Sequence, residues 1–320
     1  MGEFDLIAQY FERPARHARL GVGDDCAVLR FPSDMEVAVS TDLLVEGRHF
    51  LSTVDPKRLG HKVLAVNLSD LAACGALPHA FTLSLSLPRV DPVWLEGFSQ
   101  GLLALADAHD MDLVGGDTTQ GPLTIGITVW GLMPPHTALL RHGAQVGDDL
   151  YVSGTLGDAR LALEVFRGQA SLDADDFDAM RWRMECPTPR VALGLALRGV
   201  ATSAIDLSDG LIGDLGHVLK RSHVGATLNT DWLDQGRGLS APVAALPWAK
   251  RLECVLSGGD DYELLFTAPV EARIEVEEAA LSVGTPVTRI GRIDSETGLR
   301  VIDRDGQPLS RRFASFDHFS

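Results

Sequence analysis

The sequence has few cysteines and no pattern that joins them. Its four cysteines, Cys26, Cys74, Cys186 and Cys254, are far apart, with no CxxC pair and no zinc-type spacing. Widely spaced thiols are typical of proteins in a reducing compartment, where disulfides do not persist. The spacing therefore favours a cytoplasmic protein.

Long apolar runs and a leader sequence are also absent. No run reaches the roughly 18 apolar residues of a membrane-spanning helix. The chain begins MGEFDLIAQYF, with acidic residues where a signal peptide needs basic ones, and Leu6 stands where a myristoylation motif needs Ser or Thr. We expect a soluble chain that has no membrane partner.

Positive charge is in deficit. The 28 Lys and Arg residues face 44 Asp and Glu residues, which gives a formal net charge of -16. Binding to nucleic acid needs a basic face that displaces counterions from phosphates, so this composition argues against a nucleic-acid partner. If such an acidic chain binds a nucleotide, divalent cations are the most direct means of neutralising both. We therefore expect metal dependence.

Several common catalytic motifs are missing. The sequence contains no GxxxxGK[ST] P-loop, no HExxH zinc helix, no GxSxG elbow and no pair of HRD and DFG motifs. Gly21 and Gly23 begin a GxGxxG pattern, but Cys26 occupies the place of its third glycine. These absences argue against a P-loop or Rossmann nucleotide site.

The length and the hydrophobic pattern indicate two α/β domains. With 320 residues and 45% hydrophobic content, the chain can form two cores of ordinary domain size. Aliphatic runs alternate with Gly, Ser, Thr and Asp clusters and with helical patterns. Prolines and glycines punctuate residues 131–148. We predict an N-terminal domain over residues 1–137 and a C-terminal domain over residues 138–320.

Local signals predict three strands and two helices of the first domain. Residues 36–42 read as a strand that ends in Thr41 and Asp42, and residues 112–133 read as a strand, a glycine turn and a longer strand. Helices are predicted over residues 55–75 and 91–109, because each opens with an Asp-Pro pair that is typical of a helix N-terminus.

Aspartates are distributed in a distinctive way. They are Asp24 and Asp25 in GVGDD, Asp42 in STD, Asp70 in NLSD, Asp117 in GGDTT, Asp206 and Asp209 in IDLSDG, and Asp260 and Asp261 in SGGDDYEL. We place nearly all of them at strand ends or beside glycine, where carboxylates can converge while backbone N–H groups stay open to phosphate oxygens. Hard oxygen ligands without histidine or thiolate partners suit Mg²⁺.

A structural role is the alternative for each aspartate. A lone Asp beside Gly is usually a turn residue or a helix cap, because its side chain bonds its own backbone. We assign Asp158 and Asp214 to such roles, as a cap and a solvated helix position. Five separate Asp-bearing turns are more than loop chemistry requires, so the set favours a shared metal site.

The ordered motifs resemble one family. GVGDDCAVL, STDLLVEGRHF, AVNLSDLAACGA, LVGGDTTQGP, SAIDLSDGLIGDLGH and SGGDDYELLF, in this order, are similar to the thiamine-monophosphate kinase family, which belongs to the aminoimidazole-ribonucleotide synthetase superfamily. The resemblance extends over almost the whole chain. It implies an N-terminal α/β domain that binds ATP and Mg²⁺ and pairs its strands across a homodimer, and a C-terminal α/β domain that completes an active-site cleft.

The resemblance also implies roles for particular residues. It places metal ligands at Asp25, Ser40, Thr41, Asp42, Asp70, Asp117, Asp206 and Asp209. Among these, it makes Asp42, Asp70, Asp117 and Asp209 catalytic. It places nucleotide contacts at Gly116, Asp117, Arg141 and Ser208, and substrate contacts at His49, Asp260 and Phe313. The family often has Glu at the position of Asp260 and Trp at that of Phe313. On sequence alone, each of these three residues also has a structural interpretation. Arg141 can be an exposed linker residue, His49 a polar residue with its hydrogen bonds satisfied, and Phe313 a core residue.

The implied activity is the phosphorylation of thiamine monophosphate by ATP, which gives thiamine diphosphate in the last step of its biosynthesis. The acceptor is a phosphate monoester that is largely dianionic at neutral pH, so direct in-line transfer needs no general base. Two alternatives stay open. One is a sister enzyme of the same fold with another acceptor, and the other is a non-catalytic sensor of nucleotide or metal.

Overall fold

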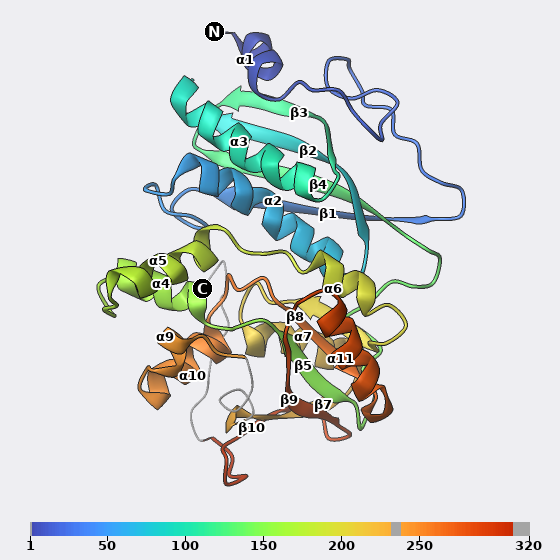
Figure 1. Ribbon diagram of the computed structural model, residues 1–320, viewed down its shortest axis with the longest axis vertical. Coiled ribbons are helices and arrows are strands. Elements are labelled where there is room, and N and C mark those ends of the chain that lie inside the picture. The colour runs from blue at the N-terminus through green and yellow to red at the C-terminus, as the bar shows by residue number, and fades with distance from the viewer. Residues whose placement is uncertain (1, 232–237, 310–320) are drawn as a thin grey trace. The chain divides into compact units, whose positions relative to one another are not determined.

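The chain forms two compact units, each with its own sheet (Figure 1). The computed structural model describes residues 2–231 and 238–309. The first unit comprises residues up to 71 together with 76–136, and the second comprises 72–75 together with the residues from 137 onward. The main division therefore falls within the segment rich in proline and glycine.

The first unit is a mixed four-stranded sheet with helices α2 and α3 on one face (Figure 1). The strand order is β1-β4-β2-β3, with β1–β4 and β4–β2 antiparallel and β2–β3 parallel. Its elements are α1 (Glu3–Tyr10), β1 (Glu36–Val45), α2 (Pro56–Ala73), β2 (Leu77–Leu87), α3 (Pro92–Ala108), β3 (Asp112–Gln120) and β4 (Thr124–Met133). The crossover through α3 supplies the long connection that two parallel strands require.

The two predicted helices of this unit are confirmed, and their caps show why they begin where they do. The Asp55 carboxylate accepts the N–H groups of Lys57 and Arg58 at 2.9 and 3.2 Å, and Asp91 accepts two N–H groups of α3 in the same way. A proline follows each cap, at a position whose N–H would have no helical partner. Local chemistry alone is sufficient to start both helices.

Two predicted strand limits are wrong. β1 continues past Asp42 to Val45, because its last three residues pair with β4. Gly116 and Asp117 lie within β3, where they pair with β2, and the turn comes later, at residues 121–123. Asp42 and Asp117 are therefore inside edge strands instead of in turns, because strand pairing overrides the local preference of glycine for a turn.

The other face of the four-stranded sheet carries exposed apolar side chains. Side chains alternate along β1, so that Leu44 is buried while Val39 and Leu43 on the opposite face are 59% and 60% exposed. Among the described residues, no helix of the first unit covers this face. An exposed aliphatic face of this kind is typical of an interaction surface.

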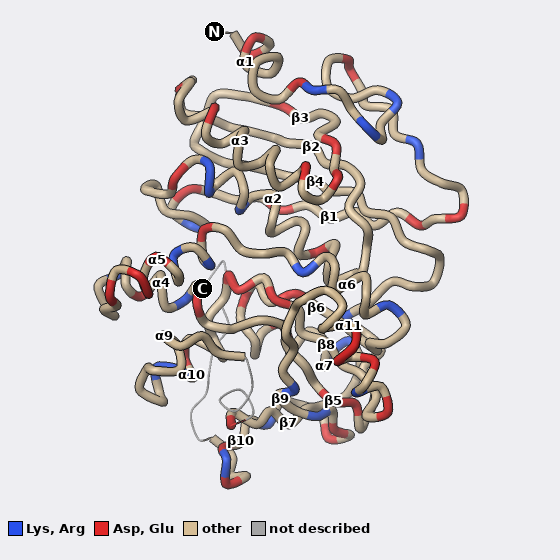
Figure 2. Tube along the Cα trace, in the orientation of Figure 1, with Lys and Arg blue, Asp and Glu red and all other residues tan. Residues whose placement is uncertain are grey.

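The segment before β1, which carries Asp25, is anchored by a buried carboxylate. Asp112 is 1% exposed and accepts the backbone N–H groups of Arg16, His17 and Ala18 at 2.7, 2.6 and 3.1 Å. Burial raises the pKa of Asp112, whereas these N–H groups and the Arg16 side chain lower it. Their combined effect exceeds that of burial, so the pKa lies below its ordinary value. Basic and acidic residues both occur along this segment (Figure 2).

Replacement of this anchor should destabilise the protein in a pH-dependent way. For Asp112→Asn we expect the free energy of unfolding at pH 7 to fall by about 1.5–3 kcal/mol, the contribution of hydrogen bonds to a charged group. Because the folded-state pKa is depressed, the stabilisation is fully present above about pH 4 and is lost as the pH falls through that lower pKa. Urea denaturation of both proteins from neutral to acidic pH measures the difference.

The matched control for this variant is Asp107→Asn. Asp107 pairs with Arg13 at 2.6 Å but its side chain is 56% exposed. We expect its replacement to cost less than about 1 kcal/mol at every pH. An Asp112→Asn effect as small as that of the control, or one that does not shrink in acid, would contradict the anchor.

The second unit is a six-stranded, mainly antiparallel sheet, ordered β10-β7-β9-β5-β8-β6, with β10–β7 as its parallel pair. Its elements are β5 (Asp149–Ser153), α4 (Asp158–Phe166), α5 (Ala174–Glu185), α6 (Val191–Ala196), β6 (Ser203–Asp206), α7 (Leu211–Ser222), β7 (Gly225–Asn229), α9 (Ala241–Ala244), α10 (Trp248–Ser257), β8 (Leu264–Ala268), the 3₁₀ helix η1 (Val270–Ala272), α11 (Arg273–Ser282), β9 (Val287–Asp294) and β10 (Gly298–Ile302). Leu150, Val152 and Leu265 from its strands pack with Leu215 and Val218 of α7 in the core.

A buried ionic cluster lies inside this unit. Glu263 has no exposed surface and accepts hydrogen bonds from Arg183 at 2.6 Å, from Arg190 at 2.6 and 2.5 Å, and from the Ser153 hydroxyl at 2.5 Å. Both carboxylate oxygens are used, so the charge is fully compensated.

Among the described helices of the protein, none is both long and apolar enough to cross a membrane.

Candidate functional site

In the first unit, β1 and α2 bring several predicted residues together. The Ser40 hydroxyl donates to the Asp70 carboxylate at 2.5 Å, and the Asp42 backbone N–H donates to the Asn67 side-chain oxygen at 3.1 Å. Ser40 and Asp42 share a face because they are two residues apart in a strand, and Asn67 and Asp70 share a face because they are one helical turn apart. We call Ser40, Asp42, Asn67 and Asp70 the β1–α2 group.

Asn67 was not among the predicted site residues, although its spacing from Asp70 in NLSD was the signal for it. Its side-chain nitrogen donates to the Val63 carbonyl at 2.9 Å, which holds its oxygen toward Asp42. Asn67 is fully buried, whereas Ser40, Asp42 and Asp70 are half-buried. Asn67 therefore fixes the strand backbone, and the oxygens of the other three are the accessible ones.

The Thr41 side chain does not join this group. Thr41 points to the opposite face of β1, where its hydroxyl donates to the Ile127 carbonyl at 3.0 Å and lies 2.9 Å from the Thr128 hydroxyl. The alternation of strand side chains makes this unavoidable for a residue between Ser40 and Asp42. A ligand role for Thr41 beside Asp42 would have to use its main-chain oxygen.

Asp117 is also apart from the β1–α2 group. The register aligns Asp42, Ile127, Leu83 and Gly116 across the sheet, and β1 and β3 are its two edges. Three strand spacings of about 4.8 Å separate these edges by about 14 Å. Asp117 therefore starts from the opposite edge of the sheet to Asp42.

Gly116 has a structural role beside its predicted contact with nucleotide. Its φ is 151°, and a Cβ atom built on it would lie 1.8 Å from the Leu83 carbonyl oxygen. No other residue fits there without a shift of the neighbouring strand. The glycine that precedes Asp117 is thus required by the close approach of β2.

Asp25 and His49 flank β1. Asp25 is exposed, and its N–H donates to the Asp24 side chain at 2.8 Å. The His49 Nδ1 atom accepts the Val45 N–H at 2.9 Å, so the neutral ring carries its hydrogen on Nε2. Nε2 is therefore the atom with which neutral His49 can donate a hydrogen bond.

The oxygens of the β1–α2 group fit magnesium better than a metal that needs an all-protein cage. Within residues 2–231 and 238–309, no three His, Cys, Asp or Glu side chains are arranged to hold a metal ion. Mg²⁺ usually takes one or two carboxylates and completes its shell with water and phosphate oxygens. Two half-buried carboxylates with a neighbouring hydroxyl match that requirement.

In the second unit, Ser208 and Asp260 are brought together. The Asp260 N–H donates to the Ser208 carbonyl at 2.9 Å, and the Tyr262 hydroxyl donates to the Asp260 carboxylate at 3.1 Å. Asp260 and Tyr262 have φ values of 68° and 50°, a strained conformation for residues with a side chain. Asp206 is buried at the end of β6, two residues before Ser208.

Asp214 is buried, so its prediction as a solvated helix position is wrong, and Asp158 is not a helix cap, because the N-cap of α4 is Gly157. Asp158 accepts hydrogen bonds from the hydroxyls of Thr155 and Ser240, both at 2.5 Å. Asp214 is 3% exposed, and burial raises its pKa to about 7 against the lowering effect of nearby backbone N–H groups. The helical pattern identified their positions but not which side of the helix is covered.

Arg141 lies at the far end of α7 from Ser208. Its side chain is exposed, its carbonyl accepts the Ser222 hydroxyl at 3.3 Å, and the preceding carbonyl accepts the Ala204 N–H at 2.9 Å. Ser222 ends the 12-residue helix whose N-terminus follows the Ser208 turn. At 1.5 Å per residue this helix is about 18 Å long, so the backbones of Arg141 and Ser208 lie at opposite ends of it. Phe313, the remaining predicted residue, lies outside the described residues.

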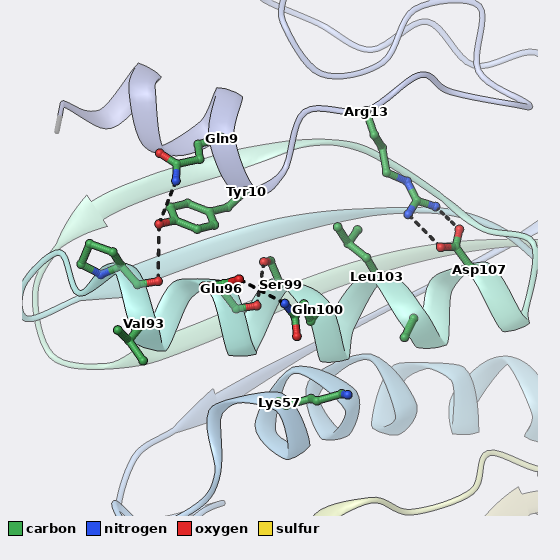
Figure 3. Close-up of a pocket in the computed structure, with 12 residues that line it drawn as sticks. Gln9, Tyr10, Arg13, Lys57, Val93, Glu96, Ser99, Gln100, Leu103 and Asp107 are labelled. Atoms are coloured by element: carbon green, nitrogen blue, oxygen red, sulfur yellow. Dashed lines mark hydrogen bonds and ion pairs between the residues drawn. The ribbon is translucent and has the colours of Figure 1, made fainter.

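A hollow of about 880 Å³ lies elsewhere on the first unit, between α1 and α3 (Figure 3). Its polar contacts are internal: the Tyr10 hydroxyl donates to the Pro92 carbonyl at 3.4 Å, and Arg13 pairs with Asp107 at 2.6 Å. None of the predicted site residues lines it. The hollow is therefore separate from the predicted site residues.

Comparison with protein families gives a match for each part of the chain. Residues 23–133 match the model described as AIR synthase related protein, N-terminal domain. Residues 145–304 match the model described as AIR synthase related protein, C-terminal domain. The two matches cover most of the chain.

Individual relatives agree with these matches. The thiamine-monophosphate kinase of Escherichia coli is 46% identical over 327 residues, which cover 100% of this chain and 98% of the relative. A crystal structure of thiamine-monophosphate kinase from Stenotrophomonas maltophilia has a TM-score of 0.85 at 43% identity, with 96% of both chains covered. A structure of AaThiL complexed with AMPPCP and TMP has a TM-score of 0.76 at 29% identity, and the match covers 99% of this chain and 96% of that one.

Proposed function

The chain belongs to the thiamine-monophosphate kinase family, and we propose that its predicted site residues perform the reaction of that family. The protein is an ATP-dependent kinase that phosphorylates thiamine monophosphate to thiamine diphosphate. The observation that carries this function is the 46% identity that extends over the whole chain. The resemblance of the ordered motifs is thereby confirmed, and the two-unit fold agrees with it.

In the first unit, we assign metal binding to the β1–α2 group. Asp42 and Asp70 would be the carboxylate ligands of Mg²⁺, and Ser40 would supply a neighbouring hydroxyl oxygen, with Asp25 as a further ligand. Mg²⁺, when bound, neutralises phosphate oxygens of ATP and of the anionic acceptor. Asn67 holds the backbone of β1, so the two carboxylates stay in place.

We assign Asp117 to metal binding and, through the bound metal ion, to the phosphates of the nucleotide. Its position on the opposite edge strand supports a role separate from that of Asp42. Gly116 would contact the nucleotide through its backbone, which no side chain covers. His49 would donate Nε2–H to the substrate, in agreement with the bond that Nδ1 accepts.

In the second unit, we assign metal binding to Asp206 and Asp209 and a nucleotide contact to Ser208. The hydrogen bond between Asp260 and the Ser208 carbonyl supports a neighbouring substrate contact at Asp260. Arg141, at the other end of α7, would contact a part of the nucleotide away from the phosphate that Ser208 holds. Phe313 keeps its role as a proposed substrate contact.

The chemistry is one direct in-line transfer, for which the residues position groups instead of moving protons. The acceptor phosphate is already an anion, so no general base is required. We expect inversion of configuration when a chiral γ-phosphate is transferred. Retention, or a trapped phosphoaspartate, would contradict a single step.

The function itself is tested by product analysis. Purified protein is incubated with ATP, Mg²⁺ and thiamine monophosphate, and the products are separated by chromatography. We expect equal amounts of ADP and thiamine diphosphate, and none without Mg²⁺. Turnover of a different acceptor alone would favour a sister enzyme, whereas binding without release of ADP would favour a sensor.

We also propose that the protein is a homodimer in which strands of the two first units pair across a two-fold axis, with the exposed face of the sheet in the interface. Val39 and Leu43 supply its apolar surface, and self-association of such a face follows the usual two-fold symmetry of dimers. Light scattering should give about twice the 34.4 kDa mass of one chain. Leu43→Asp should lower this mass toward that of one chain, because it buries a charge in the interface.

Val93→Asp is the control for the dimer prediction. Val93 is 81% exposed on α3, which lies on the helical face of the same sheet. Its replacement should leave the mass unchanged. A wild-type mass near that of one chain at working concentration would count against the dimer.

We also propose a cytoplasmic location, which the spacing of the cysteines supports.

A further inference from the structure

We propose that Asp214 is a positioning residue that holds the turn of Ser208 and Asp209 through hydrogen bonds to its main chain. This inference rests on the proposed function of that turn in binding metal and nucleotide. Asp214 itself would touch neither ligand.

The Asp214 carboxylate lies under the turn. One of its oxygens accepts the backbone N–H groups of Asp209 and Gly210, both at 3.1 Å. The residue is 3% exposed, so water does not compete for these bonds. The turn therefore depends on this single side chain for two of its donors.

The position of Asp214 in the helix explains its choice of partners. α7 begins at Leu211, directly after Gly210, which has no side chain to cap the helix. The first N–H groups of a helix have no partner within it, and a carboxylate there is favoured by the helix dipole. Asp214, in the first turn, accepts the N–H of Gly210 at the start of the helix and the N–H of Asp209 in the turn before it.

Two consequences follow for the ligands of the turn. The N–H groups of Asp209 and Gly210 are occupied, so these two donors are not open to a phosphate, and within the turn the contacts with ligand fall to the side chains of Ser208 and Asp209. On its other side, the Ser208 carbonyl accepts the Asp260 N–H at 2.9 Å. The turn is thus held from both sides, which orients the Asp209 carboxylate before any ligand binds.

The experiment measures binding in addition to activity. Calorimetric titration with a non-hydrolysable ATP analogue and Mg²⁺ gives Kd for each variant. For Asp214→Ala we expect Kd to rise by about tenfold or more, because the turn loses both hydrogen bonds that orient the Asp209 carboxylate. For Asp214→Asn we expect less than a threefold rise, because its amide oxygen can accept the same two N–H groups.

Asp158→Ala is the matched control. Asp158 is as buried as Asp214 and stands in the first turn of α4, but its carboxylate is bonded by hydroxyls of Thr155 and Ser240. It should lower the melting temperature by a similar amount and leave Kd unchanged. If Asp214→Ala does not fold, Asp214→Ser, whose hydroxyl is too short to reach the turn, should show the same rise in Kd.

The outcomes separate this inference from the function on which it rests. Asp209→Asn tests the turn directly, and a wild-type Kd for this variant would overturn the proposed role of the turn. Loss of binding in Asp209→Asn together with a wild-type Kd in folded Asp214→Ala and Asp214→Ser would overturn the inference alone. A large loss in Asp214→Asn would also overturn it, because hydrogen-bond acceptance would then be insufficient.

Discussion

Asp42→Asn, Asp70→Asn and Asp117→Asn should each lower kcat by on the order of 10² to 10³, the usual cost of one element of a preorganised electrostatic site. Asn keeps the shape of Asp but removes the negative charge with which the carboxylate would bind a metal ion. The melting temperature should change little, since none of the three carboxylates is fully buried. Steady-state kinetics over a Mg²⁺ titration, with melting curves, measures both effects.

The geometry also predicts how these substitutions combine. Asp42 and Asp70 belong to the β1–α2 group, so the double variant should lose little more activity than either single variant. Asp117 lies on the opposite edge strand, so its effect should combine more independently with that of Asp42. Asp91→Asn, which changes a helix cap to an equally good cap, is the control and should keep normal turnover. Near-normal turnover in all three variants would overturn the metal-site assignment.

Glu263→Gln should have the largest effect on stability. Glu263 is completely buried and bonds both Arg183 and Arg190, so a neutral side chain there removes the charge that Arg190 pairs with and leaves Arg183 only its longer ion pair with Asp158, at 3.4 Å. Removal of one partner from a buried ionic cluster typically lowers the free energy of unfolding by about 3–5 kcal/mol. Urea denaturation, with amide hydrogen exchange of β5 and β8 to report on the second unit, measures this loss.

Glu277→Gln is the control for this substitution, because Glu277 is exposed on α11. It should change the stability by less than about 0.5 kcal/mol. If Glu263→Gln were also this mild, the cluster would contribute little to folding. The arginines would then find other partners or water within the second unit.

Much of this protein could be predicted from its sequence, because the signals concerned are local or lie in the order of motifs. Asp55 and Asp91 start their helices through bonds to residues two and three positions ahead, and such bonds need no distant partner. Other local signals are the alternation of strand and helix patterns along the chain, the predominance of oxygen-bearing side chains among the predicted ligands, and the spacing of Asn67 and Asp70. The family followed from the ordered motifs, which extend along the whole chain.

The tertiary structure alone decided which of these residues meet. Thr41 and Asp42 are neighbours in sequence, but strand alternation turns the Thr41 side chain to the other face of β1. Strand order places Asp117 three strands away from Asp42, and the length of α7 separates Arg141 from Ser208. Asp214 resembled a solvated helix position until packing placed it under the turn before α7. Each of these outcomes depends on register, strand order or burial, which are set by contacts between residues far apart in the chain, and a local pattern of residues carries no information about such contacts.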